Sequence, residues 1–396
     1  MIVRMAKNKN LIIVTLVAIV NALGYGIIIP VLYTYSKNFG LSDFTNGLLF
    51  ATYSLCMFLA SPIIGRMSDK FGRKPMLIIS ISGTVISFLL MAMAQSPVWL
   101  FLARALDGFT SGNVPVALAV ISDSTEGKDR AKGFGLIGAA FGFGFVFGPA
   151  ISALTSGFGL AIPFYIAAAV AALAVALVAL FLPETNKHIG EAKTGKLFDF
   201  KKLFGSIFEP HIGKTLGLSL LYTFAFAMYQ YAFQPYAVHK FNFSAAQIGQ
   251  VLTLFGALGI VSQGLIIPQT IKRLGEKVTL IVSLAIGVLA LTGLGTAANA
   301  ASIFVGLSVF YSFGNAFVAP IIQTLLSREV DAKSQGTILG INASYASIGL
   351  IFGPIVAGAL SGFEPEYPFR VAAVILAGCI GLAIMIARQK AKMIDI

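Results

Sequence analysis

The sequence predicts an all-α membrane protein of twelve transmembrane helices, arranged as two related six-helix bundles. Three observations predict this fold class: the 396 residues are 57% hydrophobic, only 11% are charged, and long apolar runs recur along the whole chain. In a water-soluble domain about a quarter of the residues are normally charged. Lipid is therefore the expected solvent for most of this protein's surface.

The apolar runs have the length of membrane-spanning helices. A helix that crosses about 30 Å of hydrocarbon needs about 20 residues. A strand barrel would show alternating hydrophobicity, which these runs lack, so helices must satisfy the backbone hydrogen bonds inside lipid. The predicted spans are 11–36, 44–65, 75–95, 98–122, 133–157, 162–182, 213–237, 245–268, 277–297, 300–326, 336–360 and 368–387.

The basic residues predict the orientation of the chain. A net charge of +12 would suggest nucleic-acid binding in a soluble protein, but of the 28 Lys and Arg residues only Lys37, Lys240 and Arg370 fall in the predicted outer segments. Arg104 falls within a span, and all the others lie on the opposite side. This is the positive-inside pattern. It predicts that both termini are cytoplasmic, and it leaves no reason to expect a nucleic-acid partner.

Residues 183–212 form the only long polar interruption, which we interpret as a cytoplasmic linker between an N-terminal bundle (1–182) and a C-terminal bundle (213–396). The two halves also repeat each other. Four features recur at separations of 202 to 205 residues: Gly72 with Gly275, Gly112-Asn113 with Gly314-Asn315, Gly148-Pro149 with Gly353-Pro354, and Pro163-Phe164 with Pro368-Phe369. Duplicated helical bundles are typical of secondary transporters, whose substrate site lies near the membrane midplane between the repeats.

The loop after the second span carries the most specific motif. Residues 65–75 read GRMSDKFGRKP, which resembles the cytoplasmic signature loop of the major facilitator superfamily. An acid at a helix N-terminus is stabilised by the helix dipole. The resemblance implies a conformational latch in which Asp69 lies against the eleventh span and Arg73 pairs with Asp123 at the end of the fourth. Its predicted members are Gly65, Asp69, Gly72, Arg73 and Asp123; the alternative is a solvated basic loop that serves topology alone.

The equivalent loop of the second half, residues 268–277, keeps the glycine at Gly275. However, Lys272 stands at the position equivalent to Asp69, and Glu276 stands at the position equivalent to Arg73. We therefore expect the second half to lack the latch.

In the fourth span, Arg104-Ala-Leu-Asp107-Gly108 resembles the family motif with an intramembrane arginine and a glycine four residues later. An unpaired charge inside a bilayer costs at least several kcal/mol, and i, i+3 spacing lets the two side chains interact. Family members usually carry an amide or a small residue at the position of Asp107. Proton coupling by Asp107 and Arg104 is therefore a hypothesis from these residues; the alternative is a salt bridge that only joins helices.

The fifth span contains Gly135, Gly144 and Gly148-Pro149, followed by Ser152-Ala153. This pattern is similar to the antiporter motif of drug-exporting members, although that motif normally ends in two glycines. Close helix packing without directional meaning is the alternative. The first span, at residues 24–33, also resembles that of twelve-span drug:proton antiporters of the tetracycline and multidrug efflux type. The resemblance covers nearly the whole chain.

Polar and aromatic side chains recur at helical spacing in several spans, as expected for a cavity that binds flat or amphipathic organic molecules. Interhelical packing is the alternative for each of them. The predicted cavity residues are Asn21, Tyr25, Asn113, Tyr222, Phe226, Tyr229, Gln230, Phe233, Gln234, Tyr311, Asn315, Asn342 and Tyr345.

These features predict a proton-coupled antiporter that exports small amphipathic or drug-like compounds from a bacterial cell across its inner membrane. We expect a monomer surrounded by lipid, with protons and a small-molecule substrate as partners. We expect no metal and no cofactor, since the proton gradient supplies the energy. Cys56 and Cys379 lie in apolar runs and are expected to pack, and the three histidines lack metal-ligand spacing.

Three alternatives remain at this stage. The first is an exporter or facilitator of a sugar, siderophore or lipid, and the second is a non-transporting sensor of the same fold. The third, an enzyme embedded in the membrane, is disfavoured because no span carries paired carboxylates, a histidine cluster or an activated nucleophile. The sequence also has no Gly-Lys-Ser/Thr phosphate loop, which argues against pumping driven by ATP.

Overall fold

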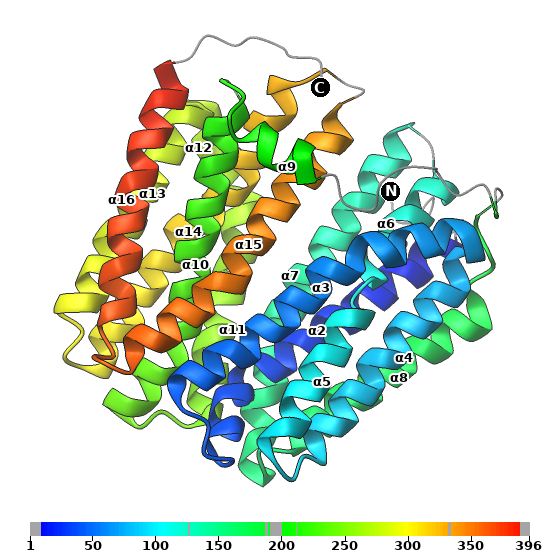
Figure 1. The fold of residues 1–396 in the computed structure, drawn as a ribbon, viewed down its shortest axis with the longest axis horizontal. Coiled ribbons are helices and arrows are strands. Elements are labelled where there is room, and N and C mark those ends of the chain that lie inside the picture. Colours follow the sequence, from blue (N-terminus) through cyan, green and yellow to red (C-terminus); the bar gives the residue numbers. More distant parts are fainter. Residues whose placement is uncertain are drawn as a thin grey trace. The chain divides into compact units, whose positions relative to one another are not determined.

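The computed structural model describes residues 9–125, 127–186, 189–190, 200–210, 212–331 and 334–388. Nearly all of these residues are helical, as predicted (Figure 1). Parts of the predicted linker and both chain ends lie outside the described residues. The helices from the first half are α2 (Lys9–Lys37), α3 (Asp43–Phe71), α4 (Arg73–Ala92), α5 (Pro97–Thr110), α6 (Asn113–Ser124), α7 (Gly127–Thr155), the short η1 (Ser156–Phe158) and α8 (Ile162–Phe181).

The second half of the chain is also built of helices. Its helices are α9 (Phe200–Ser206), α10 (Ile212–Phe241), α11 (Ala245–Val261), the π-helical η2 (Ser262–Ile266), α12 (Ile267–Leu274), α13 (Glu276–Thr296), α14 (Ala301–Glu329), α15 (Gln335–Ser361) and α16 (Tyr367–Arg388). Because η2 joins α11 to α12 without a break, the three together form one predicted span of 30 residues, Ala245–Leu274.

The helices form two compact units, and two helices are divided between them. Unit 1 contains α2, α3 from Thr52 onward, α4 to α8, and α11 as far as Gly256. Unit 2 contains α3 as far as Ala51, α9, α10, the rest of α11, and α12 to α16.

Eleven helices in the described part of the chain are long and apolar enough to cross a membrane. The remaining predicted span, 98–122, is not one helix. The structure divides it into α5 and α6, of 14 and 12 residues, with Ser111 and Gly112 between them. Neither piece alone reaches the length that a bilayer requires, so the pair together makes the predicted fourth span, with an interruption that was not anticipated from the sequence.

The break in the fourth span has a local cause. Pro115 has no N–H to donate to the carbonyl of Ser111, and its ring would collide with that carbonyl in a continuous helix. Gly112, next to Ser111, lets α3 pack closely against the break, because a Cβ there would collide with the side chain of Ile64. Prolines within other spans are tolerated, including Pro320 inside α14. At the break, Pro115 leaves the Ser111 carbonyl without its helical partner, and Gly112 allows the close contact with α3.

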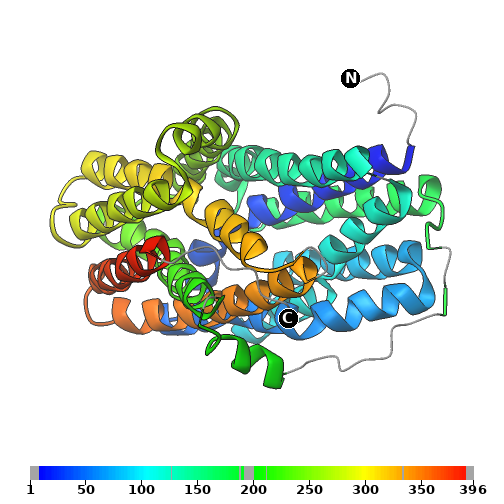
Figure 2. The ribbon, with the colours of Figure 1, turned by 90° about the horizontal axis from the view of Figure 1, so that it is seen from above.

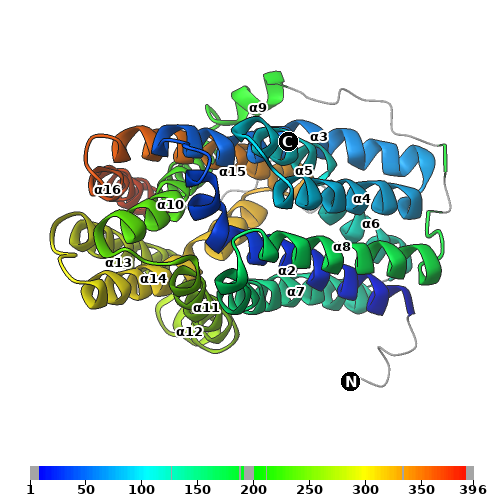
Figure 3. The same ribbon diagram turned by 90° about the horizontal axis from the view of Figure 1, so that it is seen from below.

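Within unit 1, α2 packs between α7 and α8, and α4 packs on α8 and α5 (Figure 3). The side chains of α8 show how such a helix suits lipid. Most residues of the face buried in the unit are alanines, including Ala167, Ala171 and Ala174, whereas Leu173 and Leu180 are 56% and 74% exposed. Large apolar side chains therefore cover the outside of the unit, which is favourable in hydrocarbon and unfavourable in water.

Within unit 2, α10 packs against α15 and α16, and α13 packs against α14 and α16 (Figure 2). The core contains stacked aromatic rings, with the Phe233 and Phe304 centroids 5.0 Å apart. The start of α3 belongs to this unit. Asp43 is buried there, its backbone carbonyl accepts a hydrogen bond from Tyr231 Oη, and its Oδ2 lies 3.2 Å from His239 Nε2.

Candidate functional site

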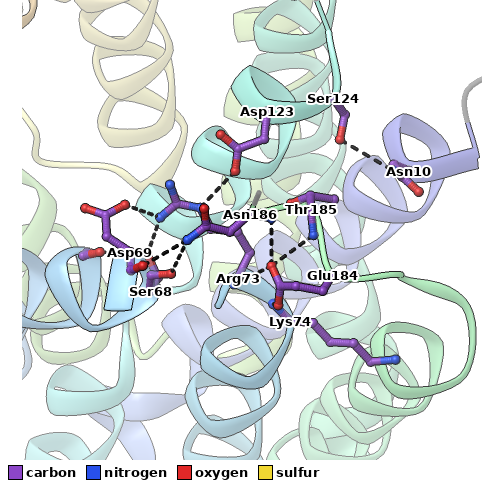
Figure 4. Close-up of polar contacts among 11 residues, drawn as sticks. Asn10, Ser68, Asp69, Arg73, Lys74, Asp123, Ser124, Glu184, Thr185 and Asn186 are labelled. Carbon is purple, nitrogen blue, oxygen red and sulfur yellow. Dashed lines mark hydrogen bonds and ion pairs between the residues drawn. The ribbon is translucent and has the colours of Figure 1, made fainter. Parts of the chain in front are cut away.

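Arg73, the first residue of α4, is the centre of the signature motif of residues 65–75 in unit 1 (Figure 4). Its Nη1 lies 2.6 Å from Asp69 Oδ1, and its Nε lies 3.0 Å from Asp123 Oδ2 at the end of α6. Nη1 also donates to Ser68 Oγ at 2.6 Å. Only 12% of the Arg73 side chain is exposed. The structure thus places the arginine of α4 against acids from two other helices, the end of α3 and the end of α6.

Glu184, just beyond α8, caps the helix that begins with Arg73. The residue before α4 is Gly72, with φ 104° and ψ 156°, and it has no side chain that could cap the helix. Glu184 Oε1 accepts from the Arg73 N–H at 2.9 Å, and Oε2 accepts from the Lys74 N–H at 3.1 Å. The first N–H groups of a helix have no intrahelical partner. A carboxylate from 111 residues away therefore satisfies two of them.

The surroundings of Glu184 also favour its charged form. Burial acts to raise the pKa of the carboxyl, but the backbone N–H groups of Asn186, Arg73, Lys74 and Thr185 all donate to it. Together these donors outweigh burial, so the pKa of Glu184 lies below its ordinary value. Its position is fixed further by the positive end of the α4 dipole.

Asn186 holds the other side of the same turn. Its side-chain amide donates to the Asp69 carbonyl at 2.9 Å and to the Ser68 carbonyl at 3.5 Å (Figure 4). These carbonyls lie near the end of α3, where helix carbonyls lack intrahelical partners. The segment after α8 therefore binds the two helix ends that flank Gly72. Sequence reasoning missed Glu184 and Asn186, because it assigned residues 183–212 to a linker, and it gave no role to Ser68 within the motif of residues 65–75.

The second-half loop also carries an ion pair. Arg328 Nη1 at the end of α14 lies 2.7 Å from Glu276 Oε2 at the start of α13. The pair joins helix ends equivalent to those that Arg73 and Asp123 join in the first half, with the signs exchanged. We expected the second half to lack the latch and did not anticipate this contact from the sequence. Each loop position was compared only with its own equivalent, and no compensating change was sought at the partner position.

Arg104 and Asp107 lie together inside unit 1, on α5. Arg104 Nη1 and Asp107 Oδ2 are 3.5 Å apart, and each residue is 4% exposed. The Arg104 guanidinium carbon also lies 4.2 Å from the centroid of the Tyr53 ring of α3, which is a cation–π contact. Arg104 Nε is buried with no hydrogen-bond partner among the described residues. The charge is thus held by one acid and one aromatic face.

Tyr53 connects this ion pair to the break in the fourth span. Ser111, between α5 and α6, donates from Oγ to the Asp107 carbonyl at 2.7 Å, and the same Oγ lies within hydrogen-bond distance, 3.1 Å, of Tyr53 Oη. The Tyr25 ring of α2 lies next to the Tyr53 ring, with centroids 6.0 Å apart. Sequence reasoning included Tyr25 but missed Tyr53 and Ser111, because no periodic pattern of polar residues marked either of them.

Two of the predicted cavity residues are brought together on the other side of the break. The Asn113 side-chain amide at the start of α6 donates to Asn21 Oδ1 of α2 at 2.9 Å. Helix breaks near the membrane midplane are a common place for transporter binding sites. In unit 1, the residues around the α5–α6 break thus include an ion pair, two tyrosines and a pair of amides.

The glycines of the fifth span differ in their surroundings. A Cβ at Gly148 would lie 2.7 Å from Gly26 Cα, and a Cβ at Gly26 would lie 3.2 Å from Gly148 Cα. Gly144 likewise packs against Ala22 of α2, and the Pro149 carbonyl faces Gly249 of α11. Gly135 has open space around it. Gly144, Gly148 and Pro149 therefore mediate helix contacts within unit 1, which Gly135 does not.

The remaining predicted cavity residues belong to unit 2. Tyr222 Oη donates to Asn315 Oδ1 at 2.6 Å, and the Tyr229 and Tyr311 rings are 4.0 Å apart between centroids. Phe226 stacks on Tyr222 and is half-buried, as is Gln230. These residues of α10 and α14 form one cluster.

Other members of the predicted set lie elsewhere. Phe233 stacks on Phe304 in the aromatic core, and Gln234 is 2% exposed. Tyr345 donates from Oη to the Leu203 carbonyl of α9 at 2.8 Å, so it faces that short helix. Asn342 is buried, and its Oδ1 has no hydrogen-bond partner in the described part of the chain.

Metal ligation has no candidate here: the described residues contain no group of three or more His, Cys, Asp or Glu that could hold an ion. Both cysteines are free and buried, in line with packing. His188 and His211 lie outside the described residues.

Comparison with known proteins decides the family. The family model of the Major Facilitator Superfamily matches residues 14–345 and 215–393. The chain belongs to the major facilitator superfamily. The sequence prediction of the family and of an all-α transporter fold is thereby confirmed, and this superfamily member is a transporter and not an enzyme.

Curated relatives cover nearly the whole of this superfamily member. It is 32% identical to Multidrug resistance protein 1 of Bacillus subtilis (strain 168), over 96% of each chain. It is 33% identical to the class C tetracycline resistance protein of Escherichia coli, over 90% of each chain. Among solved structures, a bacterial homolog of the human lysosomal transporter Spinster has a TM-score of 0.78 at 17% identity and covers 96% of both chains, which shows the fold.

Proposed function

We propose that this major facilitator superfamily member is a proton-coupled antiporter that exports small amphipathic, drug-like compounds by alternating access. The observation that carries the proposal is the Arg104–Asp107 pair, buried in unit 1 beside the break in the fourth span. An ionisable pair at such a position is costly unless it has a function. The similarity to proteins named for multidrug and tetracycline resistance supports a drug-like substrate.

Asp107 is the proposed proton carrier. In the proposed cycle its carboxylate binds one proton that enters from outside and releases it to the cytoplasm, while one substrate molecule moves outward. The proton and the substrate compete, because the proton neutralises the charge that balances Arg104. Tyr53 keeps the guanidinium in place while Asp107 changes its charge, since a cation–π contact does not depend on that carboxylate.

The test is proton-driven drug uptake into everted membrane vesicles. Asp107→Asn should bring the uptake rate with a proton gradient down to the rate without one, while binding of the drug in detergent persists. The matched control is Glu209→Gln, which removes an exposed carboxylate between α9 and α10. Full proton coupling in Asp107→Asn would refute the assignment. If no drug on a broad panel is moved, the proposed substrate class is wrong.

The latch and the orientation are part of the same proposal. Asp69, Arg73 and Asp123 would hold the cytoplasmic ends of the helices in one of the two access states and release them in the other. We propose that both termini are cytoplasmic in a bacterial inner membrane, on the basis of the distribution of Lys and Arg, and that a monomer is the transporting unit. Fluorescent-protein and alkaline-phosphatase fusions at each terminus would test the orientation; opposite sides would refute it.

A further inference from the structure

The two halves of the chain repeat a backbone turn, not only a sequence pattern. Gly72 precedes α4 with φ 104° and ψ 156°, and Gly275 precedes α13 with φ 77° and ψ 162°. L side chains rarely adopt a positive φ. Both turns therefore depend on glycine and both aim the next helix in the same local geometry, so the residues that follow are structurally equivalent.

At equivalent positions around this turn the charges are inverted. Asp69 in the first half corresponds to Lys272 in the second, and Arg73 corresponds to Glu276, each 203 residues later. The partner at the other helix end is inverted too: Asp123 at the end of α6 corresponds to Arg328 at the end of α14, 205 residues later. All three charged positions have changed sign together.

The inverted residues make the same contact. Arg73 Nε lies 3.0 Å from Asp123 Oδ2, and Arg328 Nη1 lies 2.7 Å from Glu276 Oε2. The end of α14 is anchored next to this pair, because the neighbouring Glu329 accepts a hydrogen bond from Thr215 of α10 at 2.9 Å. A loop that served topology alone would gain from a base at position 276. A carboxylate there, paired with the base on α14, is therefore not explained by topology alone.

From this correspondence we infer that Glu276 and Arg328 form a second cytoplasmic latch with inverted polarity, which biases the access states as the Arg73–Asp123 pair does. The inference rests on the proposed transport cycle. The side chain of Glu276 is 15% exposed and that of Arg328 is 67% exposed. A pair this accessible adds little to the stability of the fold. Its effect lies in the relative population of two states, only one of which makes the contact.

Charge reversal tests the inference. Glu276→Arg places two cations together and Arg328→Glu places two anions together, so each should lower the rate of transport by about twofold to fivefold. The double variant Glu276→Arg with Arg328→Glu restores an ion pair with the polarity of the first half and should recover the rate. Arg273→Glu, a charge reversal at an exposed neighbour on α12, is the matched control.

A second readout separates this inference from the proposed function. In a background with Cys56→Ser and Cys379→Ser, a cysteine introduced by Phe226→Cys reports access to unit 2 through its rate of labelling by a thiol reagent added from the cytoplasmic side. Each single charge reversal should change the labelling rate, and the double variant should restore the rate seen with the unsubstituted pair. This readout needs no substrate, so it holds even if the proposed drug export is wrong.

The inference is overturned if single reversals behave like Arg273→Glu in both assays, or if the well-folded double variant fails to recover. Thermal stability in detergent checks folding for every variant. A change in stability with no change in labelling would assign the pair a structural role only, which also contradicts the inference.

Discussion

The contribution of Glu184 to the stability of the fold depends on pH, and the contacts of its carboxylate determine the direction of that dependence. Burial raises its pKa and four backbone donors lower it further than burial raises it, so the folded pKa lies below the unfolded value of about 4.3. A depressed carboxyl pKa stabilises the fold above the unfolded pKa, and this stabilisation is lost as the pH falls through the folded pKa. Acid should therefore release the cap of α4 only at a pH below the ordinary pKa of a glutamate carboxyl.

Replacing Glu184 should expose this contribution. Glu184→Gln should lower the free energy of unfolding at pH 7 by about 1 kcal/mol, the usual cost of losing an N-cap acceptor. The difference from the unsubstituted protein should shrink as the pH falls below about 4, because the native carboxylate is then protonated as well. Thermal unfolding of purified protein in detergent across a pH range from neutral to acid measures both, and Glu209→Gln serves as the control.

If the stability difference between Glu184→Gln and the unsubstituted protein stays constant down to the acid end of that range, the carboxylate is not the capping group in solution. If Glu209→Gln loses as much stability at neutral pH, the effect comes from the change in net charge.

At the scale of helices, contact between α2 and α7 depends on the absence of side chains. A Cβ at Gly148 would lie 2.7 Å from both the Cα and the carbonyl carbon of Gly26, closer than real Cβ contacts. Gly148→Ala should therefore force the two helices apart and cost about 1–3 kcal/mol. If the glycines of the fifth span matter for direction as well as packing, transport should fall by more than the stability loss explains.

Gly138→Ala is the matched change on the same helix. A Cβ at Gly138 would meet no neighbouring atom within 4 Å, so alanine there should gain up to about 1 kcal/mol from helix propensity. Melting temperatures of the two variants in detergent should move in opposite directions. Equal shifts for both would mean that α2 and α7 are not packed as described.

The helices also show what the sequence can and cannot predict. Spans were predicted from apolar length, which depends only on local composition, and their ends agree with the structure to within a few residues, apart from the helices that end later, at Phe71 and Leu274. The break in the fourth span was missed because apolar length does not register Pro115 acting on Ser111. The charged pair Arg73–Asp123 was suggested by a family motif, whereas Glu184 was not, since no local pattern encodes a contact across 111 residues.

Within the predicted cavity set, sequence periodicity identified faces of helices but not their neighbours. Tyr222, Tyr229, Tyr311 and Asn315 do meet, because α10 and α14 present those faces to each other. Tyr345 turns toward α9, whose position no periodicity in α15 could reveal. A role in substrate binding stays a prediction for every member of the set.

At the scale of the whole molecule, Asp69 and Asp123 should contribute unequally to the first latch, and their contributions should depend on each other. Arg73 contacts both Asp69 and Asp123, at 2.6 Å and 3.0 Å, so either acid alone still compensates part of its charge. The Asp69 side chain is 40% exposed and the Asp123 side chain is 27% exposed. Water screens the more exposed pair more strongly, so Asp123 should contribute the larger share.

Asp123→Asn alone should therefore shift the population of the two access states by about twofold to fivefold, and Asp69→Asn alone by less. The double variant should shift this population by more than the product of the two single effects, because it leaves a guanidinium that is 12% exposed without either of the acids that it pairs with. The measurement is the labelling rate of the Phe226→Cys reporter in vesicles. Simple multiplication of the single effects would show that the two acids act independently, and the latch would then be two separate contacts instead of one arginine shared between two helices.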